Sequence, residues 1–155
     1  MGLTELKSIY PKLKSDDHYF MRYTCLLCDN SKCGYKVGCS LVKNNEIIAQ
    51  CWNEILPGLN KSGYETNVLW EIDSALHAEA KLIAEFAKNG KSLSGLDLYV
   101  STFPCINCAK LLTQTGIKTI YFMADFKNNF PKEILQNAGI KVVKLEQSDV
   151  WVKAI

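Results

Sequence analysis

Apolar side chains recur along the chain with two different periods, in segments that polar breaks separate. Spacing of three to four residues predicts an amphipathic helix, whereas a short run rich in β-branched and aromatic residues predicts a strand. The segments with helical spacing are 17–29, 76–88, 105–115 and 131–137. The segments that predict strands are 37–43, 46–53, 96–101, 117–123 and 140–145. Residues 1–14 contain no unbroken apolar stretch, and we assign no element to them.

Residues that tolerate a positive φ mark the ends of these elements. Asn44-Asn45 stands between the first two strands and predicts a tight hairpin turn. Asn89-Gly90, Gly116 and Gly139 each follow a helical segment and predict its end. Residues 57–67 are rich in Gly, Asn, Pro and Ser, and they predict a loop.

The order of the elements predicts how the strands pair. A hairpin makes the first two strands antiparallel. From residue 76 onward helices and strands alternate, so the later strands need helical crossovers and run parallel. We therefore expect an α/β fold with three layers, α/β/α, around a mixed five-stranded sheet. The chain shows no repeats or linkers, and we expect residues 1–155 to form a single domain.

Composition limits the class of protein. The 155 residues are 48% hydrophobic and 22% charged, and the net charge is only +2, which argues against a nucleic-acid polymer as partner. No apolar run approaches the roughly 18 residues that span a membrane. Seven cysteines without a secretory signal are typical of a reducing compartment, so we expect a cytoplasmic protein with no membrane association.

Two short motifs carry the candidate chemistry, His77-Ala78-Glu79 and Pro104-Cys105-Ile106-Asn107-Cys108. Together they offer three zinc ligands, His77, Cys105 and Cys108. A structural zinc site usually has four protein ligands, whereas a catalytic site has three and leaves one position for water. Glu79 is then the natural carrier for the proton of that water, which predicts a catalytic Zn²⁺ site.

Spacing places both motifs at the starts of helices. Cys105 and Cys108 are three residues apart, so they share one helix face in a first turn that Pro104 can open. His77 and Glu79 are two apart and can face one pocket only near a helix start, for which Asp73 and Ser74 are candidate caps. The simplest arrangement has two helices pointing their N-termini at one metal ion.

The other cysteines allow a second interpretation. Cys25, Cys28 and Cys33, with Cys39 and His18, could hold a structural zinc ion. However, Cys25 and Cys28 fall within an apolar helical pattern, where free cysteine commonly packs as a core residue. Packing is therefore the favoured interpretation, and a second zinc stays open.

With these motifs the chain resembles the cytidine and deoxycytidylate deaminase superfamily over residues 17–145, and within it the dCMP branch. Zinc-dependent nucleobase deaminases have an H-x-E and P-C-x-x-C signature. Residues 77–80, 98–110 and 115–118 carry the resemblance. Phe103 stands before Pro104, where transfer-RNA adenosine deaminases carry Glu. This difference favours the dCMP branch.

The resemblance implies a role for each matching residue. It implies a cytidine-deaminase-like fold in which His77, Cys105 and Cys108 bind zinc and Glu79 is the general acid/base. The implied contacts with substrate are Asn53 to a sugar hydroxyl, the Ala78 N–H to the base carbonyl, the Ser101–Thr102 backbone to the exocyclic amine, and Phe126 near the nucleotide. Two departures concern the substrate: Glu54 follows Asn53 where a Gly is usual, and Phe126-Lys127 stands where the branch has Lys-Tyr.

The expected function is zinc-dependent hydrolysis of a cytosine nucleotide, dCMP, to the uracil nucleotide and ammonia, in a homo-oligomer with a small-molecule nucleotide as its partner. Two alternatives stay open. One is deamination of another amine: cytidine, cytosine, guanine or a base in RNA. The other is a non-catalytic module that zinc stabilises, which would have no need of Glu79.

Overall fold

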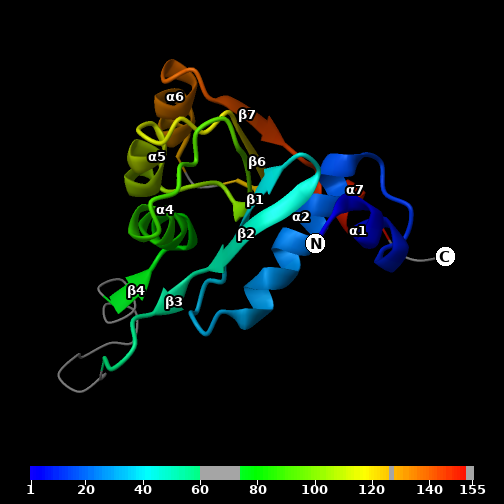
Figure 1. The fold of residues 1–155 in the computed structure, drawn as a ribbon, viewed down its shortest axis with the longest axis horizontal. Helices are drawn as coiled ribbons and strands as arrows, with labels where there is room; N and C mark the ends of the chain where they lie inside the picture. Colours follow the sequence, from blue (N-terminus) through cyan, green and yellow to red (C-terminus); the bar gives the residue numbers. More distant parts are fainter. Residues whose placement is uncertain (60–73, 126–127, 153–155) are drawn as a thin grey trace.

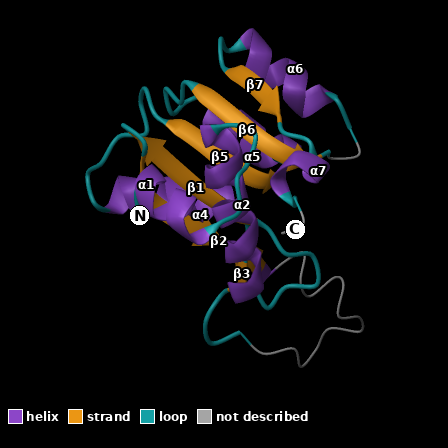
Figure 2. Ribbon diagram, turned by 90° about the vertical axis from the view of Figure 1, so that its right-hand side faces the viewer, coloured by secondary structure: helices purple, strands orange, loops and turns teal. Residues whose placement is uncertain are grey.

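The computed structural model of the chain describes residues 1–59, 74–125 and 128–152. A five-stranded sheet lies between two groups of helices (Figures 1 and 2). Its strands are β1 (Gly38–Lys43), β2 (Glu46–Trp52), β5 (Asp97–Thr102), β6 (Thr119–Ala124) and β7 (Lys141–Lys144). They are hydrogen-bonded in the order β2-β1-β5-β6-β7. The sheet predicted from the sequence is confirmed.

Strand directions also follow the prediction. β1 runs antiparallel to β2 and to β5, whereas β5, β6 and β7 are parallel. The turn between β1 and β2 has Asn44 at φ 51° and Asn45 at φ 60°, a conformation that Asn adopts more readily than most residues. The sheet is therefore mixed, with its parallel part built by helical crossovers.

Among the described residues, α-helices cover both faces of the sheet. On one face are α1 (Leu3–Ile9), α2 (Asp16–Leu27) and α7 (Gln147–Val150), and on the other α4 (Ala78–Lys88), α5 (Ile106–Leu112) and α6 (Phe130–Asn137). A separate two-stranded sheet pairs β3 (Glu54–Ile55) with β4 (Ala75–Leu76). The three-layer α/β/α fold is confirmed.

Apolar side chains of the central strands point alternately to the two faces of the sheet, and they contribute to a hydrophobic core on each face. On β5, Leu98 and Val100 belong to the cluster under α4, α5 and α6, and Tyr99 belongs to the cluster under α1 and α2. A fully buried Leu or Val side chain contributes about 1.5–3 kcal/mol relative to an exposed one. Packing on both faces therefore fixes the register of β5, the strand that leads into the second metal-ligand motif.

Several predictions about element ends were wrong. The helix predicted from residue 76 begins at Ala78 with His77 as its N-cap, so Ser74, which precedes β4, does not cap it. Asp73, the other candidate cap, lies outside the described residues. The predicted helix over 105–115 is shorter, from Ile106 to Leu112. In the described part of the chain, the short elements α1, β3, β4 and α7 were not predicted. None of the helices in the described ranges is long and apolar enough to cross a membrane.

Candidate active site

The first metal-ligand motif lies at the junction of β4 and α4. His77 has an extended backbone (φ −66°, ψ 148°) and is the N-cap of α4, and its carbonyl accepts the Lys81 N–H at 2.9 Å. Glu79 follows in the first turn and is only 4% exposed. Because the helix starts here rather than earlier, His77 and Glu79 both face the same cavity, as their spacing predicted.

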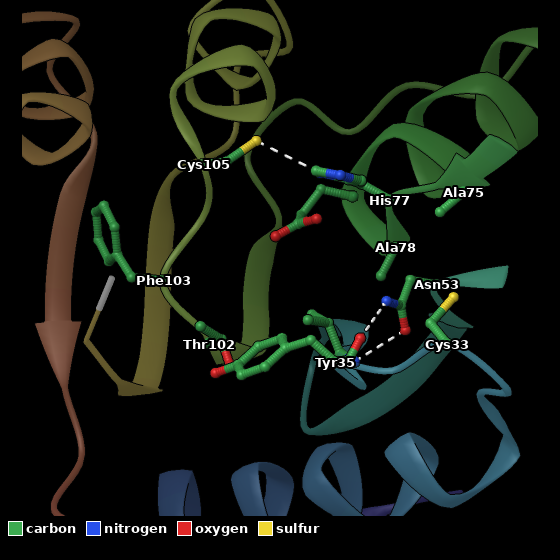
Figure 3. A pocket seen from close by; sticks show the side chains of 11 residues that line it. Cys33, Tyr35, Asn53, Ala75, His77, Ala78, Thr102, Phe103 and Cys105 are labelled. Atoms are coloured by element: carbon green, nitrogen blue, oxygen red, sulfur yellow. Dashed lines mark hydrogen bonds between the residues drawn. The ribbon is translucent and has the colours of Figure 1, made fainter. Parts of the chain in front are cut away.

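The second motif opens α5. Cys105 is the N-cap of this helix, with an extended backbone at φ −65° and ψ 167°. Cys108 lies one turn further on and is buried. The N-terminal end of a helix carries partial positive charge, which favours a thiolate. Both helices thus direct their N-termini at one point, as the sequence predicted (Figure 3).

The ligand atoms are spaced as a zinc ion requires. His77 Nδ1 lies 3.4 Å from Cys105 Sγ and 3.6 Å from Cys108 Sγ. Zn–S bonds of about 2.3 Å and a Zn–N bond of about 2.0–2.1 Å at a tetrahedral angle place N and S about 3.6 Å apart. Within residues 1–59, 74–125 and 128–152, these three side chains form the only group of His, Cys, Asp or Glu ligands close enough to share a metal. The donor set therefore fits zinc.

Electrostatics at the site follow from its close contacts. A hydrogen bond from the Cys108 thiol lowers the pKa of Cys105, and the same bond raises the pKa of Cys108, so Cys105 ionises first. A hydrogen bond with Cys105 raises the pKa of His77. Burial raises the pKa of the Glu79 carboxyl to about 6, because the charged form loses its water. A carboxyl with a pKa near neutrality can both accept and donate a proton.

A cavity of about 220 Å³ opens beside the ligands (Figure 3). Its polar wall includes Asn53, whose side-chain amide is hydrogen-bonded to the backbone of residues 35 and 37. Asn53 Oδ1 accepts the Val37 N–H at 2.9 Å, and Asn53 Nδ2 donates to the Tyr35 carbonyl at 2.7 Å. The Tyr35 hydroxyl lies 3.0 Å from Thr102 Oγ1 at the end of β5.

The structure brings most of the predicted site residues together. Asn53, Ala78 and Thr102 line the cavity together with His77, Glu79 and Cys105. Ser101 is not among the lining residues, because its Oγ accepts the Gly38 N–H at 3.1 Å on the side of the sheet that faces α2. Phe126 and Lys127 lie outside the described residues, as does most of the predicted loop 57–67.

The candidate ligands of a second zinc do not meet. The Cys25 thiol lies 3.8 Å from Met123 Sδ, whereas the Cys28 thiol contacts Ser101 Oγ at 3.4 Å. Cys33 is buried in the wall of the cavity, and His18 is hydrogen-bonded to Ser15. Among the described residues they form no group that could share a metal ion, which leaves packing as the interpretation of these cysteines.

Sequence reasoning missed five residues of the cavity wall. They are Cys33, Tyr35, Val37, Ala75 and Phe103. Phe103 adjoins Pro104 of the second motif, and Ala75 lies two residues before His77, so proximity to the motifs was a usable signal. Tyr35 follows Gly34 in a polar segment without periodicity, and nothing in its immediate sequence marks it.

Comparison with known proteins agrees with this geometry. The family described as the cytidine and deoxycytidylate deaminase zinc-binding region matches residues 14–124. ComE operon protein 2 of Bacillus subtilis is 31% identical over 140 residues, which are 88% of this chain and 74% of that protein. Deoxycytidylate deaminase of Enterobacteria phage T4 is 36% identical over 83 residues, 52% of this chain and 43% of the phage enzyme.

The fold has a close counterpart among solved structures. The dCMP deaminase of cyanophage S-TIM5, solved in complex with dCMP and dUMP, superposes with a TM-score of 0.72 at 28% identity. The match covers 86% of this chain and all of that one. Fold, ligand geometry and family match point the same way: this chain is a member of the cytidine and deoxycytidylate deaminase family.

Proposed function

We propose that the protein is a zinc-dependent deaminase that hydrolyses dCMP to dUMP and ammonia. The observation that carries this proposal is a group of three ligand atoms at zinc spacing beside a cavity that the buried Glu79 carboxyl also lines. A structural zinc site has no use for such a carboxyl. The phage T4 and cyanophage S-TIM5 relatives are named as deaminases of the same nucleotide.

His77, Cys105 and Cys108 would hold the ion. Zinc in this position supplies Lewis-acid chemistry that lowers the pKa of water from 15.7 towards about 7. Three protein ligands would leave one position of the ion for water, and the cavity that His77 and Cys105 line has room for the substrate beside them.

Glu79 moves the protons. Its carboxylate accepts one proton from the attacking water and passes it to N3 of the base. It then accepts the remaining proton of the added hydroxyl group and passes it to the amine, which leaves as ammonia. A pKa of about 6 allows both directions of transfer near neutral pH. Because the carboxyl is buried beside the ligands, its proton exchanges with the substrate rather than with bulk water.

The surrounding residues orient the base and sugar. We assign the Ala78 N–H to the base carbonyl and the Ser101–Thr102 backbone to the exocyclic amine. The Asn53 amide nitrogen carries two hydrogens, and one of them is bonded to the Tyr35 carbonyl. The other hydrogen would donate to the sugar hydroxyl. Phe126 is assigned to the nucleotide by family resemblance alone.

We further propose that residues 1–155 form one catalytic domain that assembles as a homo-oligomer in the cytoplasm. The support for assembly is that α5, next to the site, exposes the apolar side chains of Ile106 and Leu111. Seven free cysteines and a nucleotide substrate suit a reducing compartment.

The variant Glu79→Gln tests the role of the carboxyl. An amide of the same shape keeps fold and zinc but cannot exchange protons, so we expect turnover of dCMP to fall by about 10²–10⁴. The matched control is Glu85→Gln, an exposed glutamate on the same helix, which should keep the wild-type rate. Retention of more than about a tenth of the wild-type kcat by Glu79→Gln, with zinc bound, would contradict the assignment.

A further inference from the structure

Tyr35 lies on the wall of the cavity opposite His77 and Cys105 (Figure 3). It lies in the loop before β1, and its side chain is 64% exposed although it lines the cavity. Figure 3 shows the ring across the cavity from His77 and Cys105. An aromatic side chain thus lies on the cavity wall opposite these two metal ligands.

Contacts at both ends hold this exposed side chain in place. Asn53 Nδ2 donates to the Tyr35 carbonyl at 2.7 Å, and Asn53 Oδ1 accepts the Val37 N–H at 2.9 Å, so one amide fixes the backbone on either side of Lys36. At the far end, the Tyr35 hydroxyl is hydrogen-bonded to Thr102 Oγ1 at 3.0 Å. An aromatic ring that is oriented before the ligand arrives loses little conformational entropy when it binds.

The shape of the cavity determines what the ring can meet. A base that enters the cavity with its reacting carbon towards His77 and Cys105 has Tyr35 on its other side (Figure 3). Among the other lining residues, Val37, Ala75 and Ala78 are too small to cover a planar ring, and the Phe103 ring packs on Phe122 with centroids 4.7 Å apart. Aromatic side chains stack on every base, because each base has a π-face.

We propose that Tyr35 is a substrate-contacting residue that packs its ring against the pyrimidine, and that Asn53 and Thr102 position this ring. The inference rests on the proposed function, since it names the face of the site that receives the base. It assigns Asn53 a second task, because its amide orients the aromatic wall as well as reaching towards the sugar. The ring supplies binding and takes no part in proton transfer.

The test uses the zinc-loaded full chain and compares Tyr35→Ala with Tyr35→Phe. The readouts are the Kd of the product dUMP by calorimetry, and KM and kcat for dCMP. We expect Tyr35→Ala to raise both Kd and KM about tenfold to a hundredfold, which is the range for loss of one base–aromatic stack. Its kcat should stay within about threefold, since uniform binding affects KM alone. Tyr35→Phe keeps the ring and should stay within about fivefold of the wild-type Kd.

Ile48→Ala removes an exposed apolar side chain on β2 outside the cavity wall and should leave all three quantities unchanged. If Tyr35→Ala proved unable to fold, Tyr35→Leu replaces it with the same expectation. Unchanged dUMP affinity in Tyr35→Ala, equal losses in the Ala and Phe variants, or a loss confined to kcat would each overturn the inference. Wild-type activity on dCMP is measured before any variant is compared. If the wild-type protein failed to convert dCMP, that result would instead overturn the proposed function.

Discussion

At the scale of single residues, the surroundings of Glu79 decide what its carboxyl can do. An unperturbed glutamate has a pKa of about 4.3 and is a weak proton donor at neutral pH. Burial raises the pKa of Glu79 to about 6, nearer to the pH at which the enzyme would work. The helix start at His77 causes this burial, because it turns the next acidic side chain into the cavity rather than to the surface.

The ligand set predicts the metal content of single variants. Wild-type protein purified without chelator should hold about one zinc per chain, and Cys105→Ala should hold close to none, because two ligands cannot complete the site. Cys28→Ala, which removes a cysteine outside the ligand group, is the control and should keep the wild-type zinc content. Elemental analysis measures all three. Full zinc in Cys105→Ala would exclude this cysteine as a ligand, and two equivalents in the wild type would point to a second site.

At the scale of elements, the approach of α2 to β1 leaves no room for a side chain at Gly38. A Cβ there would lie 2.5 Å from the Thr24 carbonyl oxygen and 3.0 Å from Leu27 Cβ. Real Cβ atoms do not approach backbone so closely, and the Gly38 N–H also donates to Ser101 Oγ. Gly38 therefore sets how deeply α2 packs on the sheet, next to the segment that Asn53 holds.

Gly38→Ala should lower the free energy of unfolding by about 1–3 kcal/mol, the usual range for overpacking a core position. Chemical denaturation measures this change. Gly2→Ala is a suitable control, because its Cβ would meet nothing nearer than 3.9 Å and the residue has no positive φ. Equal stability of Gly38→Ala and wild type would show that α2 can shift away from β1 without loss.

The elements show which parts of the fold a sequence pattern can predict. Strands β1, β2, β5, β6 and β7 and helices α2, α4, α5 and α6 were predictable because each has its own apolar period. The two-residue strands β3 and β4 have none, and they form only because residues 54–55 and 75–76 meet in the folded chain. Helix α1 has seven residues, of which only Leu6 is buried.

The same distinction applies to the site. His77, Glu79, Cys105 and Cys108 are paired by short spacings, so the metal ligands and the acid could be predicted from the sequence. Tyr35 reaches the cavity through hydrogen bonds to Asn53 and Thr102, which lie 18 and 67 residues further along the chain. No local pattern encodes such a contact, because it depends on the order of the strands.

At the scale of the whole molecule, the sheet separates the site from a second core. Under α1 and α2, Tyr99 stacks on Tyr121 with ring centroids 4.5 Å apart, and Phe20 packs at 5.4 Å. The Tyr99 hydroxyl, in a side chain only 2% exposed, donates to Asp17 Oδ1 at 2.6 Å. The metal ligands lie at the helices of the opposite face. Stability and zinc binding should therefore respond to separate substitutions.

Tyr99→Phe tests this separation through pH. Burial raises the pKa of Tyr99 well above its usual value of 10.0. The folded chain thus keeps a proton that the unfolded chain releases, so this contribution to stability is complete below pH 10 and declines as the pH rises further. The wild-type free energy of unfolding should fall above pH 10 by up to about 1.4 kcal/mol per pH unit from this group.

Tyr99→Phe should be about 1.5–3 kcal/mol less stable at pH 8, since it loses a hydrogen bond to a carboxylate, and should show a shallower decline above pH 10. Urea denaturation at pH 8, 10 and 11 measures both effects, with zinc content unchanged as the check on the site. Parallel curves for the two proteins would mean that Tyr99 ionises as readily in the folded chain as in the unfolded one.

The most direct measurement of the central claim is a comparison of substrates for the zinc-loaded wild-type protein. dCMP, cytidine, deoxycytidine, cytosine and guanine are assayed side by side for ammonia release, with formation of each deaminated product followed by absorbance. Because a charged hydrogen bond to the phosphate contributes about 1.5–3 kcal/mol, kcat/KM for dCMP should exceed that of the nucleosides by at least about tenfold. A higher kcat/KM for cytidine, cytosine or guanine than for dCMP would contradict the proposed substrate, and release of ammonia from none of them would contradict the proposed reaction.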